Sequence, residues 1–249
     1  MLPRVIPCLL LRERGLVKTR QFKSDVYIGD PVNAVRIFND KEVDELILLD
    51  IDATREGRPP DWEVISEIAG ECFMPVAYGG GITSLAQVQQ VIRCGIEKVV
   101  INSASYRSLE VIAEASAIFG SQAIVAAVDA RKPVFGAHKV YSCSGTREEP
   151  VRLQDHVKAL VEAGAGEIFI NSIDRDGMMN GYDIELIRKV CDATRTPVIA
   201  SGGAGKISHL IEAVEQGGAS AVAAGSIFVF HGKHNAVLIN YPKDAFLDA

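Results

Sequence analysis

The sequence repeats itself at an offset of 122 positions, and this repeat limits the folds open to the chain. Residues 75–82 (PVAYGGGI) return as residues 197–204 (PVIASGGA), and residues 45–52 (ELILLDID) return as residues 167–174 (EIFINSID). After one extra residue the match resumes, with residues 101–103 opposite residues 224–226. Such a repeat indicates two similar halves, each of about 120 residues. We place them at residues 1–120 and 121–249.

Eight short apolar runs alternate with segments of helical periodicity. The runs are continuous rather than alternating, as is typical of parallel strands buried on both faces. Strands are expected near residues 5–10, 46–51, 75–78, 98–101, 123–128, 168–171, 197–200 and 221–224. Helices are expected near residues 31–39, 61–71, 84–93, 109–118, 153–163, 183–191 and 207–216. The pattern predicts an α/β fold, a single (β/α)8 TIM barrel over residues 1–249 built of two half-barrels.

Two segments depart from this pattern. Residues 12–29 read as a long polar loop that carries Lys18 and is a candidate lid over an active site. Residues 231–249 read as an irregular, short C-terminal segment, in which residues 234–241 have room for two helical turns before Pro242 ends them. The eighth helix of the barrel is therefore expected to be short.

Composition excludes several classes of protein. The net charge of −6 and the absence of a basic run argue against a nucleic-acid or membrane partner. No apolar run reaches the roughly 18 residues of a membrane span, and no signal pattern is visible at the N-terminus. The five cysteines lack CxxC spacing, which suggests reduced thiols in a cytoplasmic protein. The five histidines are scattered, so we expect no metal site and no cofactor.

Glycine turns and small polar residues follow four of the predicted strands, where active sites of this fold lie. The turns at residues 79–81 and 202–203 pair with Asn102-Ser103 and Gly225-Ser226, respectively. Backbone N–H groups at such turns bind phosphate, so two pockets predict a ligand with a phosphate at each end. Tight strand-to-helix turns without a ligand are the alternative. The binding candidates are Gly81, Asn102, Ser103, Gly203, Gly225 and Ser226.

Carboxylates also lie at predicted strand ends. Asp129 ends the fifth strand and is a candidate general acid or base, with a structural turn cap as the alternative. The repeat places Leu10 opposite Asp129, and leucine transfers no proton. Asp50 ends the second strand, and Asp176-Gly177 lie beside the second pocket.

A charged set lies at the starts of four strands, on the opposite rim of the barrel. Its members are Arg4, Glu45, Lys98 and Glu167. By position alone, mixed charges there indicate a stabilising layer of salt bridges.

The chain resembles the cyclase subunit of imidazole glycerol phosphate synthase over residues 1–230. The resemblance rests on residues 29–31 (GDP), 44–46 (DEL), 79–82 (GGGI), 119–122 (FGSQ), 164–168 (GAGEI), 172–177 (SIDRDG) and 200–205 (ASGGAG). It implies a heterodimer with a glutaminase subunit, whose ammonia passes through the barrel to a bis-phosphorylated ribulosyl substrate. The products would be imidazole glycerol phosphate and an aminoimidazole carboxamide nucleotide.

The resemblance also implies roles for residues. Asp129 matches one of two acid/base aspartates, and Lys18 matches the lysine of the lid. Five residues fall at or beside phosphate-binding positions, namely Asn102, Ser103, Gly177, Gly203 and Ser226. The four charged residues at the strand starts match a gate at the ammonia entrance, a functional reading of the same layer.

Departures from the family pattern are as informative. Leu10 stands where the second catalytic aspartate is expected, Asn171 and Met178 each replace a usual threonine, and the C-terminal tail is unlike an ordinary final helix. This combination resembles a divergent branch encoded with surface-polysaccharide genes. There, a cyclase-like and a glutaminase-like subunit supply ammonia to a separate sugar amidotransferase.

Three hypotheses remain open at this point. The first is a divergent ammonia-delivering subunit of a glutamine-dependent amidotransferase or lyase, with weak or lost cyclisation. The second is a working histidine-pathway cyclase in which Asp129 and another group suffice. The third is a non-catalytic scaffold that binds a phosphorylated ligand; the related isomerase of the same pathway fits the motifs less well.

Overall fold

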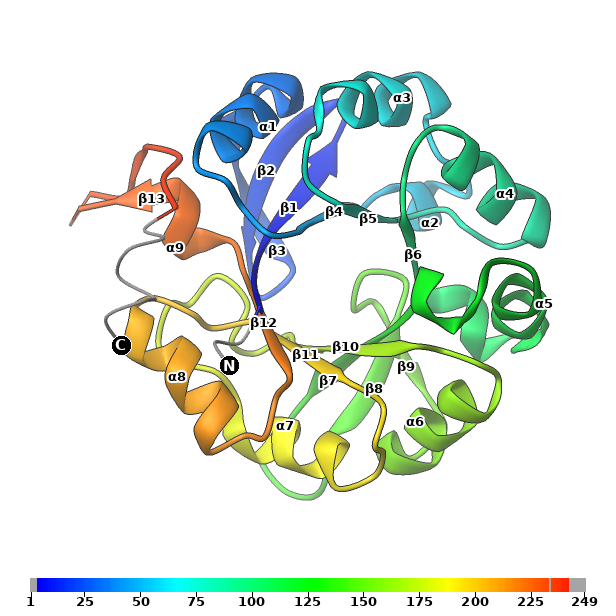
Figure 1. Cartoon of the computed structure of the whole chain (residues 1–249). Coiled ribbons are helices and arrows are strands. Elements are labelled where there is room, and N and C mark those ends of the chain that lie inside the picture. Colours follow the sequence, from blue (N-terminus) through cyan, green and yellow to red (C-terminus); the bar gives the residue numbers. More distant parts are fainter. Residues whose placement is uncertain (1–3, 233, 242–249) are drawn as a thin grey trace.

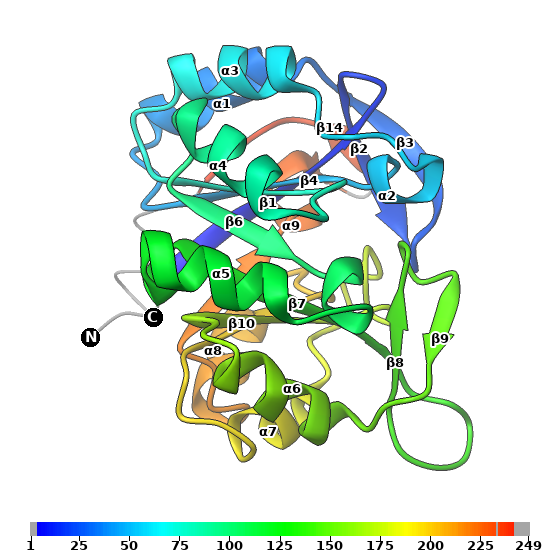
Figure 2. The same cartoon turned by 90° about the vertical axis from the view of Figure 1, so that its right-hand side faces the viewer.

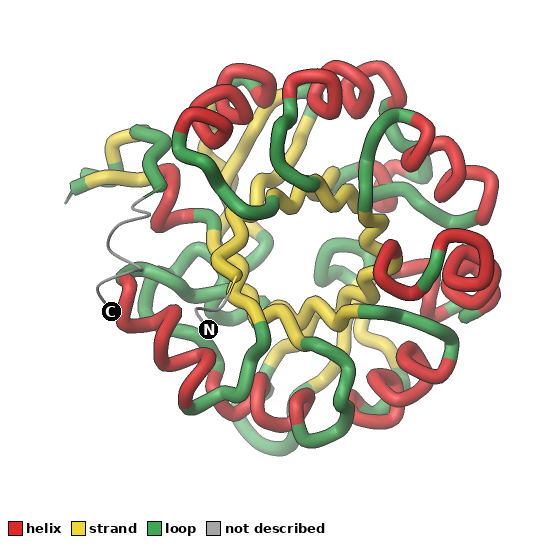
Figure 3. Tube along the Cα trace, in the orientation of Figure 1, coloured by secondary structure: helices red, strands yellow, loops and turns green. Residues whose placement is uncertain are grey.

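The chain folds into a closed barrel, seen along its axis in Figure 1 and as a trace in Figure 3. The structure is a computed structural model that describes residues 4–232 and 234–241. Parallel pairing runs through eight strands and returns to the first, which confirms the predicted (β/α)8 fold. In ring order these are β1 (Arg4–Arg12), β4 (Leu46–Asp50), β5 (Val76–Gly79), β6 (Lys98–Ile101), β7 (Ile124–Arg131), β10 (Glu167–Ser172), β11 (Val198–Ser201) and β12 (Ala221–Ala224).

Each of the seven predicted helices is present on the outside of the ring. They are α1 (Pro31–Asp40), α3 (Trp62–Glu71), α4 (Leu85–Arg93), α5 (Glu110–Phe119), α6 (Leu153–Glu162), α7 (Ile184–Cys191) and α8 (Ile207–Glu215). Local chemistry sets several of their starts, since Asp30, Asp61 and Ser84 each accept a hydrogen bond from a first-turn N–H group. Shorter turns of helix are α2 (Ala53–Glu56), α9 (Ser226–Val229), η1 (Ser103–Tyr106) and η2 (Ser121–Ala123).

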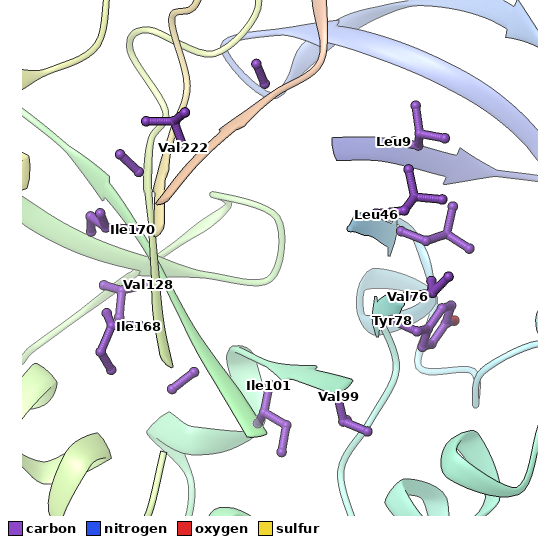
Figure 4. Close-up of a cluster of buried hydrophobic side chains, with 14 of the residues drawn as sticks. Leu9, Leu46, Val76, Tyr78, Val99, Ile101, Val128, Ile168, Ile170 and Val222 are labelled. Atoms are coloured by element: carbon purple, nitrogen blue, oxygen red, sulfur yellow. The ribbon is translucent and has the colours of Figure 1, made fainter. Parts of the chain in front are cut away.

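The core has two layers because successive side chains of a strand point to opposite faces. Leu46 and Leu48 of β4 pack outward against the helices, whereas Ile47 points into the barrel. Figure 4 shows part of the outer layer, including Leu46 and Tyr78. Burial of each such side chain contributes about 1.5–3 kcal/mol. The inner layer combines several alanines with larger apolar side chains such as Phe169.

The prediction of a polar loop over residues 12–29 is wrong. The segment is an antiparallel hairpin of β2 (Gly15–Arg20) and β3 (Lys23–Gly29), and β2 pairs with the extended end of β1. Both central residues of its turn, Gln21 and Phe22, have positive φ, as a tight hairpin turn requires. Neither is glycine or asparagine, so the usual sequence signal for this turn is missing.

A second hairpin was not predicted. It consists of β8 (Lys139–Ser142) and β9 (Arg147–Glu149), and β8 pairs with the end of β7 from Asp129 to Arg131. Figure 2 shows both hairpins on the same side of the barrel.

The two helical turns predicted for residues 234–241 are also wrong. Two short strands pair there instead, β13 (Phe230–His231) with β14 (Ala236–Val237). The Tyr241 hydroxyl then donates to the Val5 carbonyl oxygen at 3.0 Å, which ties the segment to β1. The eighth helix is short as expected, with α9 spanning four residues. Pro242 and the rest of the predicted irregular segment lie outside the described residues.

Candidate functional site

One cavity of about 470 Å³ opens at the C-terminal ends of the barrel strands. The predicted binding and catalytic residues all line it, because the ends of parallel strands converge at one mouth. They are Leu10, Lys18, Asp50, Gly81, Asn102, Ser103, Asp129, Asp176, Gly177, Gly203, Gly225 and Ser226. A ligand bound in this cavity would therefore lie close to groups from several strand ends.

Asp129 is the buried carboxylate of this cavity. It lies on β7, opposite Asn171 in the register of β10, and its Oδ2 accepts a hydrogen bond from Asn102 Nδ2 at 2.8 Å. Burial raises the pKa of Asp129 to about 7, and the charge of Asp176 acts in the same direction. A carboxyl group with such a pKa can both give and take a proton near neutral pH.

Leu10 occupies the wall across from this carboxylate. It lies on β1, beside Leu49 of β4, and packs against the apolar interior of the barrel. No proton transfer is possible from this wall at that position.

Lys18 lies inside the mouth, on strand β2. Its side chain is buried, and its Nζ donates to the Cys8 carbonyl oxygen at 2.6 Å. Glycine at position 225 leaves room for this lysine, because a Cβ there would overlap the Lys18 ammonium in its present position. Burial lowers the pKa of Lys18, and in the described part of the chain no carboxylate forms a salt bridge with it. An anionic ligand would supply the missing counter-charge.

The hairpin that carries Lys18 is fastened to the loop after β10. Thr19 Oγ1 donates to Asp176 Oδ2 at 2.7 Å, and the Gln21 N–H donates to the Asp176 carbonyl oxygen at 2.9 Å. Gly177, at φ +68°, lies against the Thr19 carbonyl, where a Cβ would overlap the oxygen. Burial raises the pKa of Asp176, while the Thr19 hydrogen bond opposes that shift.

Both glycine turns pack against neighbouring loops. The Gly81 N–H donates to Thr54 Oγ1 at 3.3 Å, and a Cβ on Gly203 would overlap the Gly181 carbonyl oxygen. Packing alone thus explains glycine at Gly203, and phosphate binding at both turns stays a prediction.

Asp50 is hydrogen-bonded to other groups of the protein. Its two carboxylate oxygens accept from Arg58 at 2.8 and 3.0 Å, and Oδ1 also accepts from the N–H groups of Asp52 and Ala53. This arrangement orders the loop after β4 rather than offering Asp50 to a ligand.

Arg58 and Arg107 are two of the four arginines that line the cavity, and none of the four was predicted from the sequence. Arg58 is drawn there by Asp50, eight positions earlier. Arg107 lines the cavity just past η1 and is exposed, and within the described residues it forms no salt bridge. No motif marks either residue, since each lies several positions beyond a strand end. Among the described residues, no cluster of three histidine, cysteine or acidic side chains is arranged to hold a metal ion.

The four charged residues of the opposite rim form one closed ring of ion pairs. Arg4 pairs with Glu45 at 2.6 Å and with Glu167, and Lys98 reaches the same two carboxylates at 2.7 and 2.8 Å. Each carboxylate is therefore shared by two cations. The ring lies at the N-terminal ends of its strands, across the barrel from the cavity.

Comparison with known proteins identifies the family. A family model described as histidine biosynthesis protein matches residues 4–235. A Pseudomonas aeruginosa protein named "Putative imidazole glycerol phosphate synthase subunit hisF2" is 55% identical over 245 residues, 98% of each chain. The imidazole glycerol phosphate synthase subunit HisF of Caulobacter vibrioides is 41% identical over 247 residues, 99% of this chain and 94% of its own. The chain belongs to the HisF family.

In this HisF-family protein the cavity and the ion-pair ring lie at opposite ends of one barrel. The roles that resemblance assigns to their residues stay predictions, because geometry tests where a side chain lies and not what it does. None of the helices in residues 4–232 and 234–241 has the length and apolarity that a membrane crossing demands.

Proposed function

We propose that this HisF-family protein receives ammonia from a glutaminase partner through the barrel, and that its own cyclisation is weak or lost. The ammonia would then serve a separate amidotransferase that amidates a surface sugar. Support for the ammonia route comes from the ion-pair ring at one end of the barrel and the cavity at the other end. Relatives named as subunits of imidazole glycerol phosphate synthase support the glutaminase partner.

Leu10 is the observation that carries the proposal. It lines the cavity across from Asp129, at the position where the repeat and the family pattern expect a second carboxylate. Loss of one of two acid/base groups typically removes about 10²–10⁴-fold in rate. Binding needs no such group, so a bis-phosphorylated ligand is retained by the turns and by Lys18 while cyclisation is lost.

The test uses the purified protein with its co-purified glutaminase partner. The bis-phosphorylated ribulosyl substrate is supplied once with glutamine and once with an ammonium salt, which bypasses the partner. We expect glutamine hydrolysis, ligand binding and very slow formation of imidazole glycerol phosphate in both cases. Turnover at the rate of a histidine-pathway cyclase would overturn the proposal.

A working histidine-pathway cyclase is the second candidate. The raised pKa of Asp129, about 7, favours it, because one carboxyl group near neutrality can serve as acid and as base in turn. Complementation of a histidine-requiring cyclase mutant separates the two candidates. Growth at the normal rate supports the working cyclase.

A further inference from the structure

A chain of polar contacts leads from helix α6 to the cavity carboxylate. It runs from His156 through Ser105 and Asn102 to Asp129. We propose that Ser105 and His156 are positioning residues, which hold the Asn102 amide on Asp129 and thereby set the charge of that carboxylate. The proposal rests on the proposed function only in treating Asp129 as a working group of the site.

Ser105 donates two hydrogen bonds to the backbone of Asn102. Its N–H donates to the Asn102 carbonyl oxygen at 2.9 Å, and its Oγ donates to the same oxygen at 2.7 Å. Asn102 has φ −120° and ψ −89°, outside the regular helical and extended regions, so its conformation depends on these contacts. The amide of Asn102 then points its Nδ2 at Asp129.

His156 supports Ser105 from outside the barrel. Its Nε2 lies 3.3 Å from Ser105 Oγ, and its ring stacks on Tyr106 with centroids 4.2 Å apart. Because the Ser105 hydroxyl donates its hydrogen to the Asn102 carbonyl oxygen, the Ser105 Oγ can only accept a hydrogen bond from His156. The His156 ring must therefore carry a hydrogen on Nε2. Burial lowers the pKa of His156 to about 4, which keeps the ring neutral at pH 7.

Few charged groups lie next to this chain of polar contacts. Glu149 of β9 faces His156 and Tyr106, but it already accepts from Ser142 Oγ and pairs with Arg147 at 3.2 Å. Asp176, from the loop after β10, is the charged group that acts on Asp129. The Asn102 hydrogen bond opposes its effect by stabilising the ionised carboxylate.

The test is the titration of Asp129 in the ligand-free protein, followed by ¹³C NMR of the aspartate carboxyl carbons and assigned with Asp129→Asn. Without the Asn102 hydrogen bond the titration midpoint should rise by about one pH unit, since a hydrogen bond to a charged group is worth that much. We expect this rise in Asn102→Ala, Ser105→Ala and His156→Leu. His156→Gln, whose amide can replace the Nε2–H donor, should restore the wild-type midpoint.

Two controls separate positioning from general loosening of the fold. Ser108→Ala lies just past the same turn and removes a hydroxyl that caps the Glu110 N–H, and it should leave the midpoint unchanged. Ser105→Ala added to Asn102→Ala should raise the midpoint no further, because both act through one hydrogen bond. An unchanged midpoint in folded Ser105→Ala and His156→Leu, or an additive double variant, would overturn the proposal. The titration needs no turnover, so it stands apart from the outcome for the proposed function.

Discussion

Leu10 and Asp129 lie on opposite walls of one cavity, four strands apart in a ring of eight. The repeat makes their positions equivalent in the two halves, yet one side chain is apolar and the other is a buried carboxyl group. A reaction that needs an acid/base group on each wall therefore has only the Asp129 carboxyl group available.

Restoring a carboxyl group at position 10 tests this asymmetry. We expect Leu10→Asp to raise ammonium-dependent cyclisation by about 10²-fold or more, because it returns the missing acid/base group. Leu10→Asn is the matched control, since it has nearly the same shape and cannot transfer a proton. Equal rates in the two variants, or a wild-type rate already at the cyclase level, would contradict the loss of chemistry at Leu10.

Asp129 should make the protein less stable as pH rises. Its pKa is about 7 in the folded protein against 3.8 for an ordinary aspartate, so the folded state binds more protons between these pH values. Stability contributed by the protonated form is present at about pH 4 and is lost as pH rises through 7. We expect Asp129→Asn to be more stable than wild type by about 4 kcal/mol at pH 8, and by only about 1 kcal/mol at about pH 4.5.

Urea denaturation at these two pH values measures that difference. Asp155→Asn, on the exposed first turn of α6, is the control and should show no such pH-dependent gain. A gain for Asp129→Asn that is the same at both pH values would show that burial of the ionised carboxylate is not its cause.

Lys18 should account for much of the affinity for phosphorylated ligands. Its buried ammonium has no salt-bridge partner in the described residues, so an anion that reaches it gains a charge-assisted contact with a buried cation. We expect Lys18→Met to weaken binding of a bis-phosphorylated sugar by at least about tenfold in calorimetry, and to reduce its salt dependence. Lys23→Met, exposed on the same hairpin, should bind as wild type does.

Gly177 should be required for the hairpin of β2 and β3 to pack against the loop after β10. Alanine there would place a Cβ on the Thr19 carbonyl oxygen and push β2 away from the loop after β10. We expect faster trypsin cleavage near Arg20 in Gly177→Ala, because a detached hairpin is open to the protease. Gly57→Ala has a similar positive φ, +66°, with nothing near its Cβ, so it adds backbone strain without this contact. Equal cleavage in both variants would argue against the clash as the cause.

Lys98 should stabilise the ring of ion pairs at the N-terminal ends of the barrel strands. Lys98→Met leaves Glu45 and Glu167, both mostly buried, with only the Arg4 cation between them. We expect a loss of about 2 kcal/mol in unfolding free energy, because an uncompensated buried carboxylate is costly. Lys139→Met breaks an exposed pair with Glu148 and should leave the thermal midpoint unchanged.

Much of the fold was predictable because its signals are local. Continuous apolar runs marked all eight barrel strands, and apolar spacing marked the seven main helices. Those strand ends also indicated which residues would share the cavity, since parallel strands deliver them to one mouth. The hairpin of β2 and β3 escaped prediction because its turn lacks the usual residues. Both hairpins also pair with extensions of β1 and β7, which the apolar runs did not mark.

The sequence by itself determined the barrel, its two related halves and the presence of Asp129 and Leu10 at equivalent positions. Tertiary structure alone decided that Lys18 lies inside the mouth of the cavity and that Arg58 forms a salt bridge with Asp50. It also decided that His156 contacts Ser105, which lies 51 positions earlier in the sequence. The physical reason is that periodicity reports how a segment folds, whereas a contact between distant side chains depends on how whole elements pack.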